Sequence, residues 1–530
     1  MAAVQVQLGA VVETAQGMVR GGIRDGILFF KGMRYGGDTS GRNRFMPPPP
    51  PRTWNSVLEA MDFGPRAPQE TEAHANLAWR SWIRDLRPDS EDCLLVNVYT
   101  PAADGKKRPV MFYIHGGAFA TGSGSTSGLD GTNLAKRGDV VVVTINHRLN
   151  IFGYLHLADS GPDGGQFADA GNSGMLDIIA ALQWTRDNIA AFGGDPGCVT
   201  IFGQSGGGSK VSMLMAMPAA KGLFHRVIAQ SPGTLHRGFD PAFAEGMTAK
   251  LFAALGVDRN NPAALQDMSM AQLMEGRRKA GLTHGSLRPV VDGRHLPTHP
   301  FDPVAPALSR DIPLMIGSTD TEATFYLTMD PKNFDMDEAQ ACVKMQEILD
   351  ADDAGCKRLM AEYRKRRPGA SPFELLIAIQ SRHCFRRNCI IAAERKSAQG
   401  GAPTYVYEFA WNSPVEVGPG VTLRSPHTTC IPFAFGTVDA AAAMLGTGQD
   451  RYALSEKMMD AWVAFAHTGN PNSVDKKAGL PEWKPYSASD RSTMVFDNDC
   501  QVVSDRDRDD RLALDAYPPY TPEKGAARKR

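Results

Sequence analysis

The sequence of 530 residues lacks the features that mark several specialised classes of protein. Its eight cysteines and 36 prolines are too few for a disulfide scaffold or a collagen-like chain. It has no uninterrupted run of about 18 apolar residues, so we expect no membrane-spanning helix. The 57 basic residues (Lys and Arg) balance 58 acidic ones, which gives no overall attraction to nucleic acid or to an anionic membrane.

The cysteines and the N-terminal residues bear on the cellular compartment. No two cysteines form a Cys-x-x-Cys pair, and reduced thiols in a cytoplasmic protein are the favoured interpretation. The first residues show no cationic start followed by an apolar run, so no secretory leader is visible. Because a chain from which a leader had been removed would read the same, a secreted or periplasmic location remains the alternative.

What the sequence does contain is an alternation of strand-like and helix-like segments. Residues 109–114 and 140–145 are almost entirely apolar, as expected of parallel strands that helices cover on both faces. Apolar residues recur at helical spacing over 176–192. Further strands are predicted at 199–202, 312–316 and 404–409. We therefore predict an α/β protein with a doubly wound, mostly parallel central sheet flanked by helices.

No linker-like composition divides the chain, and we predict a single domain over residues 1–530. The segments 235–300 and 325–400 are interpreted as helical, lid-like insertions that shape a binding pocket. Five residues are candidates for lining an apolar gorge, with packing in the core as the alternative for each: Phe325, Tyr326, Met329, Phe385 and Phe433.

Residues 203–207, Gly-Gln-Ser-Gly-Gly, follow the predicted strand at 199–202 and precede a predicted helix. In a G-x-S-x-G sequence at this place the serine occupies a strained strand-to-helix turn and presents its hydroxyl at the N-terminus of the helix. Small neighbours keep that turn free of clashes. Ser205 is therefore the candidate nucleophile, and a glycine-rich loop without chemistry is the alternative.

Two alternatives that would need a bound group are excluded. Residues 203–208 fit the glycines of a phosphate-binding loop, but such a loop continues with Lys and then Ser or Thr, whereas here Ser209 precedes Lys210. His295 and His299 have the spacing of a helical zinc pair, but a proline between them breaks the helix. We predict neither a cofactor nor a metal site.

A second glycine-rich turn follows the predicted strand at 109–114. Residues 115–118 read His-Gly-Gly-Ala, and their small side chains allow backbone N–H groups to approach a tetrahedral oxyanion. We predict an oxyanion hole with three donors, the amides of Gly117, Ala118 and Gly206. An ordinary turn at the end of a strand is the alternative.

Longer segments carry a resemblance to a known family. Residues 192–207 resemble the active-serine signature of the type-B carboxylesterases in the α/β-hydrolase superfamily, and residues 91–99 resemble the second signature of that family. Shorter matches extend over nearly the whole chain and are most similar to bacterial para-nitrobenzyl-esterase-like members. The resemblance implies the α/β-hydrolase fold and a Ser–Glu–His triad in that chain order.

The resemblance also indicates the remaining members of the triad. Glu322 ends a Gly-Ser-Thr-Asp-Thr-Glu stretch after the predicted strand at 312–316, in the place of the family's acid, with Asp320 as the competitor. His427 precedes an Ile-Pro-Phe-Ala-Phe-Gly stretch, in the place of the family's histidine.

Other positions are interpreted only through this resemblance. Arg148 and Asp177 are expected to form a buried ion pair, and Ser231 to place a hydroxyl near the triad. Gly206 stands where alanine is commoner, which we expect to keep the amide donor and only to loosen the packing. No cysteine precedes Cys93, so the disulfide of the cholinesterase relatives cannot form, and a choline ester is disfavoured as substrate.

Together these residues predict a serine carboxylester hydrolase that acts on small to medium, neutral esters. His427 takes the proton of Ser205, and Glu322 orients the imidazole and stabilises its charged form. An amide or carbamate hydrolase with the same triad is one alternative, and a non-catalytic adhesion or scaffold relative is another. The expected partner is a small-molecule ester, with no nucleic acid and no membrane; the sequence indicates no particular oligomeric state.

Overall fold

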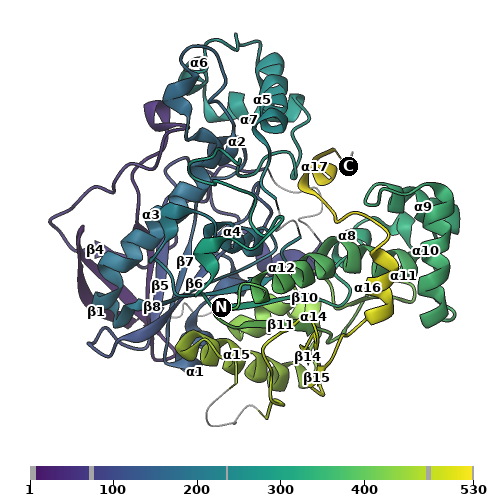
Figure 1. Ribbon diagram of the computed structural model, residues 1–530. Helices are drawn as coiled ribbons and strands as arrows, with labels where there is room; N and C mark the ends of the chain where they lie inside the picture. The colour runs from purple at the N-terminus through teal and green to yellow at the C-terminus, as the bar shows by residue number, and fades with distance from the viewer. Residues whose placement is uncertain (1–6, 71–76, 234–236, 473–478, 528–530) are drawn as a thin grey trace.

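The computed structural model describes residues 7–70, 77–233, 237–472 and 479–527. A 13-stranded sheet runs through this part of the chain (Figure 1). Across the sheet the strands are β1 (Gln7–Thr14), β2 (Gly17–Arg24), β3 (Ile27–Arg34), β5 (Leu95–Thr100), β7 (Val141–Ile145), β6 (Arg108–Ile114), β8 (Gly194–Gln204), β9 (Arg226–Gln230), β10 (Leu314–Thr319), β11 (Thr404–Phe409), β14 (Thr493–Phe496) and β15 (Gln501–Val503). β4 (Leu58–Glu59) pairs with β2, and β12 (Ser413–Gly418) pairs separately with β13 (Val421–Arg424).

The centre of the sheet is parallel. Strands β7, β6, β8, β9, β10, β11 and β14 each pair in parallel with their neighbours in this block. Antiparallel strands flank the block, with β1, β2, β3 and β5 on one side and β15 on the other. The predicted mostly parallel sheet is confirmed, and each strand predicted from the sequence overlaps an observed one.

Both faces of the central sheet are buried, which explains the continuous apolarity of its strands. In β6, Val110, Phe112 and Ile114 belong to the hydrophobic core on one face, and Met111 and Tyr113 belong to the core on the other. Successive side chains of a strand point to opposite faces, so a strand buried on both sides needs apolar residues at every position.

Helices cover the two faces in layers. α3 (Ser173–Asn188), α4 (Gly206–Leu214) and α12 (Arg387–Ser397) contribute to the first core. α1 (Thr132–Gly138), α13 (Cys430–Phe435) and α15 (Asp450–Thr468) contribute to the second. The other short helices are α2 (Asn150–Tyr154), α8 (Thr324–Leu327), α14 (Ala442–Leu445), α16 (Arg508–Leu514) and α17 (Pro522–Ala527). No helix in the described ranges combines the length and the apolarity needed to cross a bilayer.

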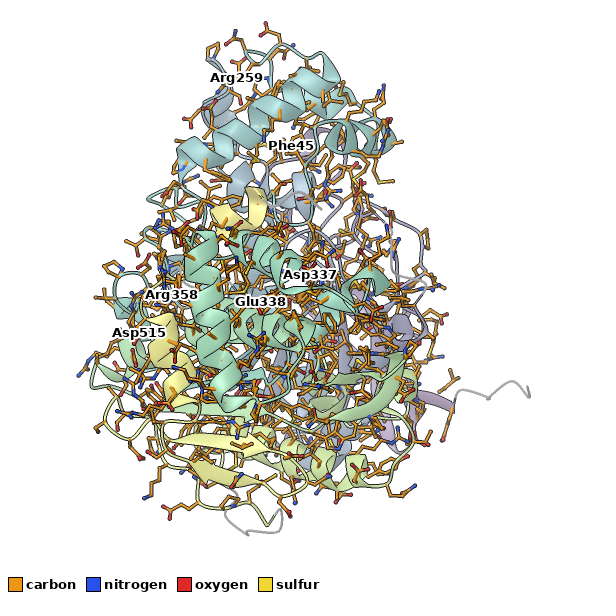
Figure 2. The ribbon with its side chains drawn as sticks, turned by 90° about the vertical axis from the view of Figure 1, so that its right-hand side faces the viewer. Phe45, Arg259, Asp337, Glu338, Arg358 and Asp515 are labelled. Atoms are coloured by element: carbon orange, nitrogen blue, oxygen red, sulfur yellow. The ribbon has the colours of Figure 1, made fainter. Side chains whose placement is uncertain are left out.

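Two further groups of helices lie at different places around the sheet. α5 (Pro241–Leu255), α6 (Ala264–Asp267) and α7 (Met270–Lys279) stand at the top of Figure 1, and Figure 2 labels Arg259 there. α9 (Glu338–Gln346), α10 (Asp353–Arg366) and α11 (Pro372–Ser381) form the second group, where Figure 2 labels Asp337, Glu338 and Arg358.

The predicted helical character holds for the second group and only partly for the first. Residues 280–306 contain no helix or strand element, so the expectation of a helical insertion over 235–300 is wrong beyond residue 279. Five prolines fall between residues 289 and 306. Each removes a backbone N–H that a helix or a strand ladder would use.

A buried ion pair ties the loop after β7 to helix α3. Arg148 Nη2 donates to Asp177 Oδ1 at 2.6 Å, and the backbone N–H of Arg148 donates to Asp177 Oδ2 at 2.9 Å. The two side chains are 2% and 0% exposed. Burial alone would lower the pKa of Arg148, but the adjacent carboxylate of Asp177 raises it above its ordinary value. The expected pair is present, and each charge depends on the other.

We expect Asp177→Ala to lower the free energy of unfolding by about 3–5 kcal/mol, because it leaves Arg148 buried without a counter-charge. Chemical denaturation followed by tryptophan fluorescence measures the change. Asp187→Ala is the matched control, since Asp187 pairs with Arg186 on the exposed side of the same helix and its loss should have little effect. Equal losses in the two variants would contradict the prediction.

Candidate active site

The carboxyl ends of adjacent parallel strands bring the predicted site residues to one edge of the sheet. Residues 115–118 follow β6, Ser205 follows the neighbouring strand β8, and Glu322 follows β10. β9 lies between β8 and β10. His427 comes from the segment after β13, and its backbone N–H donates to the carbonyl oxygen of Glu322 at 3.3 Å.

Ser205 occupies a strained turn between β8 and α4. Its φ of 60° and ψ of −123° lie outside the regions that L-residues favour. Its backbone N–H donates to Gln230 O at 2.8 Å, and its carbonyl oxygen accepts from Ser209 N at 2.9 Å as the helix begins. A Cβ on Gly207 would lie 2.0 Å from Ile114 O, so only glycine fits there. The predicted strand, tight turn and helix with small neighbours are confirmed.

Glu322 and His427 form a buried, hydrogen-bonded pair. His427 Nδ1 donates to Glu322 Oε2, and the other carboxylate oxygen accepts from the backbone N–H of Thr319 at 2.8 Å. Glu322 is 0% exposed and His427 is 1% exposed. A carboxylate held in this way fixes the imidazole tautomer that leaves Nε2 free to accept a proton.

Asp320, the competing acid, pairs with an arginine instead. Arg382 Nη2 donates to Asp320 Oδ1 at 2.7 Å, and Arg382 Nη1 donates to the carbonyl oxygen of Asp320 at 2.7 Å. Burial alone would raise the pKa of Asp320, but Arg382 holds that pKa below its ordinary value. Of the two candidate acids, Glu322 is the one that the structure brings to His427.

Gln204, the residue before the serine, contacts the same imidazole. Its Nε2 lies 3.3 Å from His427 Nδ1 and 3.2 Å from His427 Nε2, and its side chain is buried. In the described part of the chain Ser205 Oγ makes no hydrogen bond to His427. Such catalytic contacts commonly tighten only when substrate binds. Sequence reasoning missed Gln204, although its place directly before Ser205 puts it at the same strand end.

The turn after β6 lies directly against the serine turn. Gly117 and Ala118 have positive φ angles of 84° and 51°. A Cβ on Gly116 would lie 3.3 Å from Ser205 Cβ, and a Cβ on Gly206 would lie 2.1 Å from Ala118 O. The structure thus brings together the three residues predicted to supply oxyanion donors, and their role stays a prediction.

The absence of a side chain at residue 206 is a requirement of this packing. Ala118 Cα and the Ala118 carbonyl carbon would also lie 2.5 and 2.6 Å from a Cβ on Gly206. These are backbone atoms, which cannot move aside as the tip of a flexible side chain can. The expectation that glycine only loosens the packing here is therefore wrong, because Gly206 is what allows Ala118 to approach the first turn of α4.

Aromatic rings surround the histidine. The ring centroids of Phe385, Tyr326 and Phe325 lie 4.9, 5.4 and 5.8 Å from that of His427. All three belong to the 325–400 segment, so this insertion supplies an apolar wall beside the imidazole.

The other two gorge candidates have different surroundings. Phe433 is 0% exposed and packs against other aromatic residues in the core, so the core alternative is right for this residue. Met329 is half-buried, and its sulfur accepts a hydrogen bond from Arg80 at 3.8 Å.

Ser231 has a described place in the backbone, whereas a role of its hydroxyl near the triad stays a prediction. It follows β9, the strand between those that lead to Ser205 and Glu322, and its backbone N–H donates to Gly317 O at 2.7 Å. Its hydroxyl is buried and has no hydrogen-bond partner among the described residues.

The two histidines with zinc-like spacing pair with different carboxylates. His295 Nε2 lies 2.7 Å from Asp169 Oδ1, and His299 Nε2 lies 3.1 Å from Asp240 Oδ1. Within the ranges that the structure describes, no group of three or more His, Cys, Asp or Glu is arranged to hold a metal ion. Each histidine is accounted for by its own carboxylate.

Residues 9–514 match the family model described as "Carboxylesterase family". The chain belongs to the carboxylesterase family. The resemblance found in the sequence is thereby confirmed, and the esterase is a serine ester hydrolase.

Characterised relatives match the esterase over nearly its whole length. It is 33% identical over 520 residues to para-nitrobenzyl esterase of Bacillus subtilis (strain 168), covering 95% of this chain and 98% of that protein. It is 30% identical over 517 residues to phenmedipham hydrolase of Pseudarthrobacter oxydans, with the same coverage of 95% and 98%. The crystal structure of carboxylesterase EST55 of Geobacillus stearothermophilus superposes with a TM-score of 0.82 at 36% identity, covering 95% of this chain and 100% of that one. The predicted α/β-hydrolase fold is confirmed.

We expect Gly206→Ala to lower kcat for a simple ester by about 10²–10³-fold, the loss typical of one missing oxyanion donor, because the new methyl group displaces Ala118. Steady-state kinetics with a chromogenic ester measures the change. Gly246→Ala on α5 is the control, since a Cβ there meets no atom within 4 Å. Wild-type turnover in the Gly206→Ala enzyme would show that the close approach is not needed.

Proposed function

We propose that the esterase hydrolyses small to medium, neutral carboxyl esters through an acyl-enzyme formed on Ser205. The observation that carries the proposal is the buried Glu322–His427 pair beside the strained serine turn. A serine hydroxyl is a poor nucleophile unless a neighbouring base takes its proton, and an oriented imidazole is such a base.

In the first half of the reaction, His427 removes the proton of Ser205 as Oγ attacks the carbonyl carbon of the ester. The three predicted backbone amides stabilise the tetrahedral oxyanion. The imidazolium, stabilised by Glu322, returns its proton to the alcohol oxygen as the C–O bond breaks. In the second half, water takes the place of the serine hydroxyl as nucleophile, and the carboxylic acid leaves.

We also propose that the chain acts as one domain in which both insertions shape the pocket. Three aromatic residues of the 325–400 segment surround His427. From the 235–300 segment, the guanidinium of Arg288 lies 5.3 Å from the ring centroid of Phe119, which follows the predicted oxyanion turn. The apolar wall favours neutral acyl or alcohol groups over charged ones, because a charge there would lose its hydration.

Carbamate hydrolysis is a second candidate, because one relative is named phenmedipham hydrolase and phenmedipham is a carbamate. The same acyl transfer to Ser205 serves esters, carbamates and amides. The test compares kcat/KM for an ester, its isosteric carbamate and its isosteric amide. Each set is measured over a series of acyl and alcohol lengths, which distinguishes ester hydrolysis from carbamate and amide hydrolysis. We expect the ester to have the highest kcat/KM. A higher kcat/KM for the carbamate than for the matched ester would make carbamate hydrolysis the leading candidate function.

We expect Ser205→Ala to lower kcat by about 10⁴- to 10⁶-fold, because it removes the nucleophile. Ester turnover, and labelling by a fluorophosphonate with mass mapping of the modified peptide, measure the loss. Ser212→Ala is the control, because its hydroxyl donates only to the carbonyl of Gly208 within α4. Full turnover without the Ser205 hydroxyl would refute the proposal.

We expect Glu322→Gln to lower kcat by about 10⁴-fold, because an amide no longer holds the required tautomer of His427. Asp320→Asn is the matched control for the acid and should keep most of the turnover, because it weakens the ion pair with Arg382 and leaves the Glu322–His427 pair in place. Thermal unfolding of both variants separates loss of fold from loss of chemistry. A greater loss of kcat in Asp320→Asn would move the role of acid to Asp320.

We propose a cytoplasmic location for the esterase. All eight cysteines have free thiols and six of them are buried, which suits a reducing compartment. Recovery of the native protein from a periplasmic or extracellular fraction would contradict this location.

A further inference from the structure

Helix α4 carries a buried lysine that the proposed mechanism does not use. Lys210 is 0% exposed, and its Nζ donates to the carbonyl oxygens of His115 at 3.1 Å and Ala118 at 2.8 Å. These two carbonyls bracket the turn that is predicted to supply two of the three oxyanion donors. The ammonium therefore joins both ends of that turn to the helix that begins after Ser205.

The ammonium group of Lys210 is not paired with a carboxylate in the described part of the chain. Burial lowers the pKa of Lys210 to about 7. The rings of His115 and His147 are stacked 4.5 Å apart, and the pKa of each is lowered, by burial first and then by Lys210, so both are neutral. The ring centroid of Phe119 lies 5.2 Å from Lys210 Nζ. A buried and unpaired ammonium is costly, and such groups cluster at functional sites.

Lys210 and Gly206 act on the same carbonyl. The two residues are four apart on α4 and therefore lie on one face of the helix. Ala118 O lies 2.8 Å from Lys210 Nζ. The same oxygen would lie only 2.1 Å from a Cβ added to Gly206, so it occupies the space that a side chain at residue 206 would need. The missing side chain makes room for the carbonyl of Ala118, and the ammonium holds it there.

We propose that Lys210 is a positioning residue for the oxyanion hole: its ammonium holds the turn after β6 against α4, so that the amides of Gly117 and Ala118 converge with that of Gly206. The inference rests on the proposed ester hydrolysis at Ser205. Because the oxyanion exists only in the transition state and the tetrahedral intermediate, loss of this support should lower kcat and leave KM nearly unchanged.

The test replaces the ammonium by groups of similar shape. We expect Lys210→Met, which has no donor, to lower kcat by about 100-fold, and Lys210→Gln, which keeps N–H donors on a shorter side chain, to lower it by about 10-fold. A trifluoromethyl ketone, which adds to Ser205 and places an oxyanion in the hole, should lose affinity by the same factors. The matching methyl ketone, which stays a neutral carbonyl, should bind all three enzymes alike.

Lys396 on α12 provides a matched control. It is 0% exposed, and its Nζ donates to the carbonyl oxygens of Arg310 at 3.0 Å and Ala402 at 3.4 Å, away from the serine turn. Burial lowers its pKa to about 8. We expect Lys396→Met to leave kcat and the affinity for the trifluoromethyl ketone at their wild-type values, although it removes the same kind of buried group.

The outcomes distinguish failure of the positioning role of Lys210 from failure of the proposed ester hydrolysis at Ser205. Wild-type kcat in Lys210→Met, equal losses in Lys210→Met and Lys396→Met, or equal losses of affinity for the two ketones would overturn the inference alone. Full turnover in Ser205→Ala would overturn the proposed function instead. If Lys210→Met does not fold, Lys210→Gln decides by itself, and a kcat and ketone affinity equal to those of wild type would count against the inference.

Discussion

Burial of both faces of the central sheet is the constraint on which the rest of the structure depends. A strand such as β6 divides its side chains between two cores and has only apolar or aromatic residues from Pro109 to Ile114. Chemistry is therefore confined to the residues that come immediately after the strands end. Because β6, β8 and β10 run in the same direction, these residues meet at one edge, where Ser205, Glu322 and the turn after β6 are found. The site is a direct result of strand direction and two-sided packing.

Three buried ionisable arrangements in this fold differ in how their charge is balanced. Arg148 and Asp177 neutralise each other and join a loop to a helix. Glu322 is held by a backbone amide and by His427, an imidazole that gains and loses a proton in the proposed cycle. Lys210 donates to two backbone carbonyl oxygens, and no carboxylate in the described part of the chain forms an ion pair with it. The first arrangement is explained by stability alone, whereas an uncompensated ammonium beside a site that develops negative charge is better explained by function.

The sequence predicts five strands of the parallel block, β6, β7, β8, β10 and β11, because two-sided burial gives them short, mainly apolar runs. It does not predict flanking strands such as β1, whose residues are largely exposed. It also predicts Ser205 from the residue types that a strained turn demands, and Glu322 and His427 through a family resemblance. It does not predict Gln204 or Lys210, because their contacts join positions more than 90 residues apart along the chain. Lys210 stands out in the sequence only as a lysine in the wrong place for phosphate binding. The helical character expected over 235–300 ends at residue 279, because the segment that follows contains prolines, which lack the backbone N–H that a helix needs.

The contact between Ala118 and Gly206 has a consequence for how the sequence of this esterase can change. A methyl group added at residue 206 and the existing backbone path through residue 118 exclude each other. The effect of a substitution at one position therefore depends on the residue present at the other, which is epistasis in its simplest steric form. A mutational route toward the alanine commoner in the family must first open the conformation of residue 118, so the order of the two steps decides whether the intermediate protein is active.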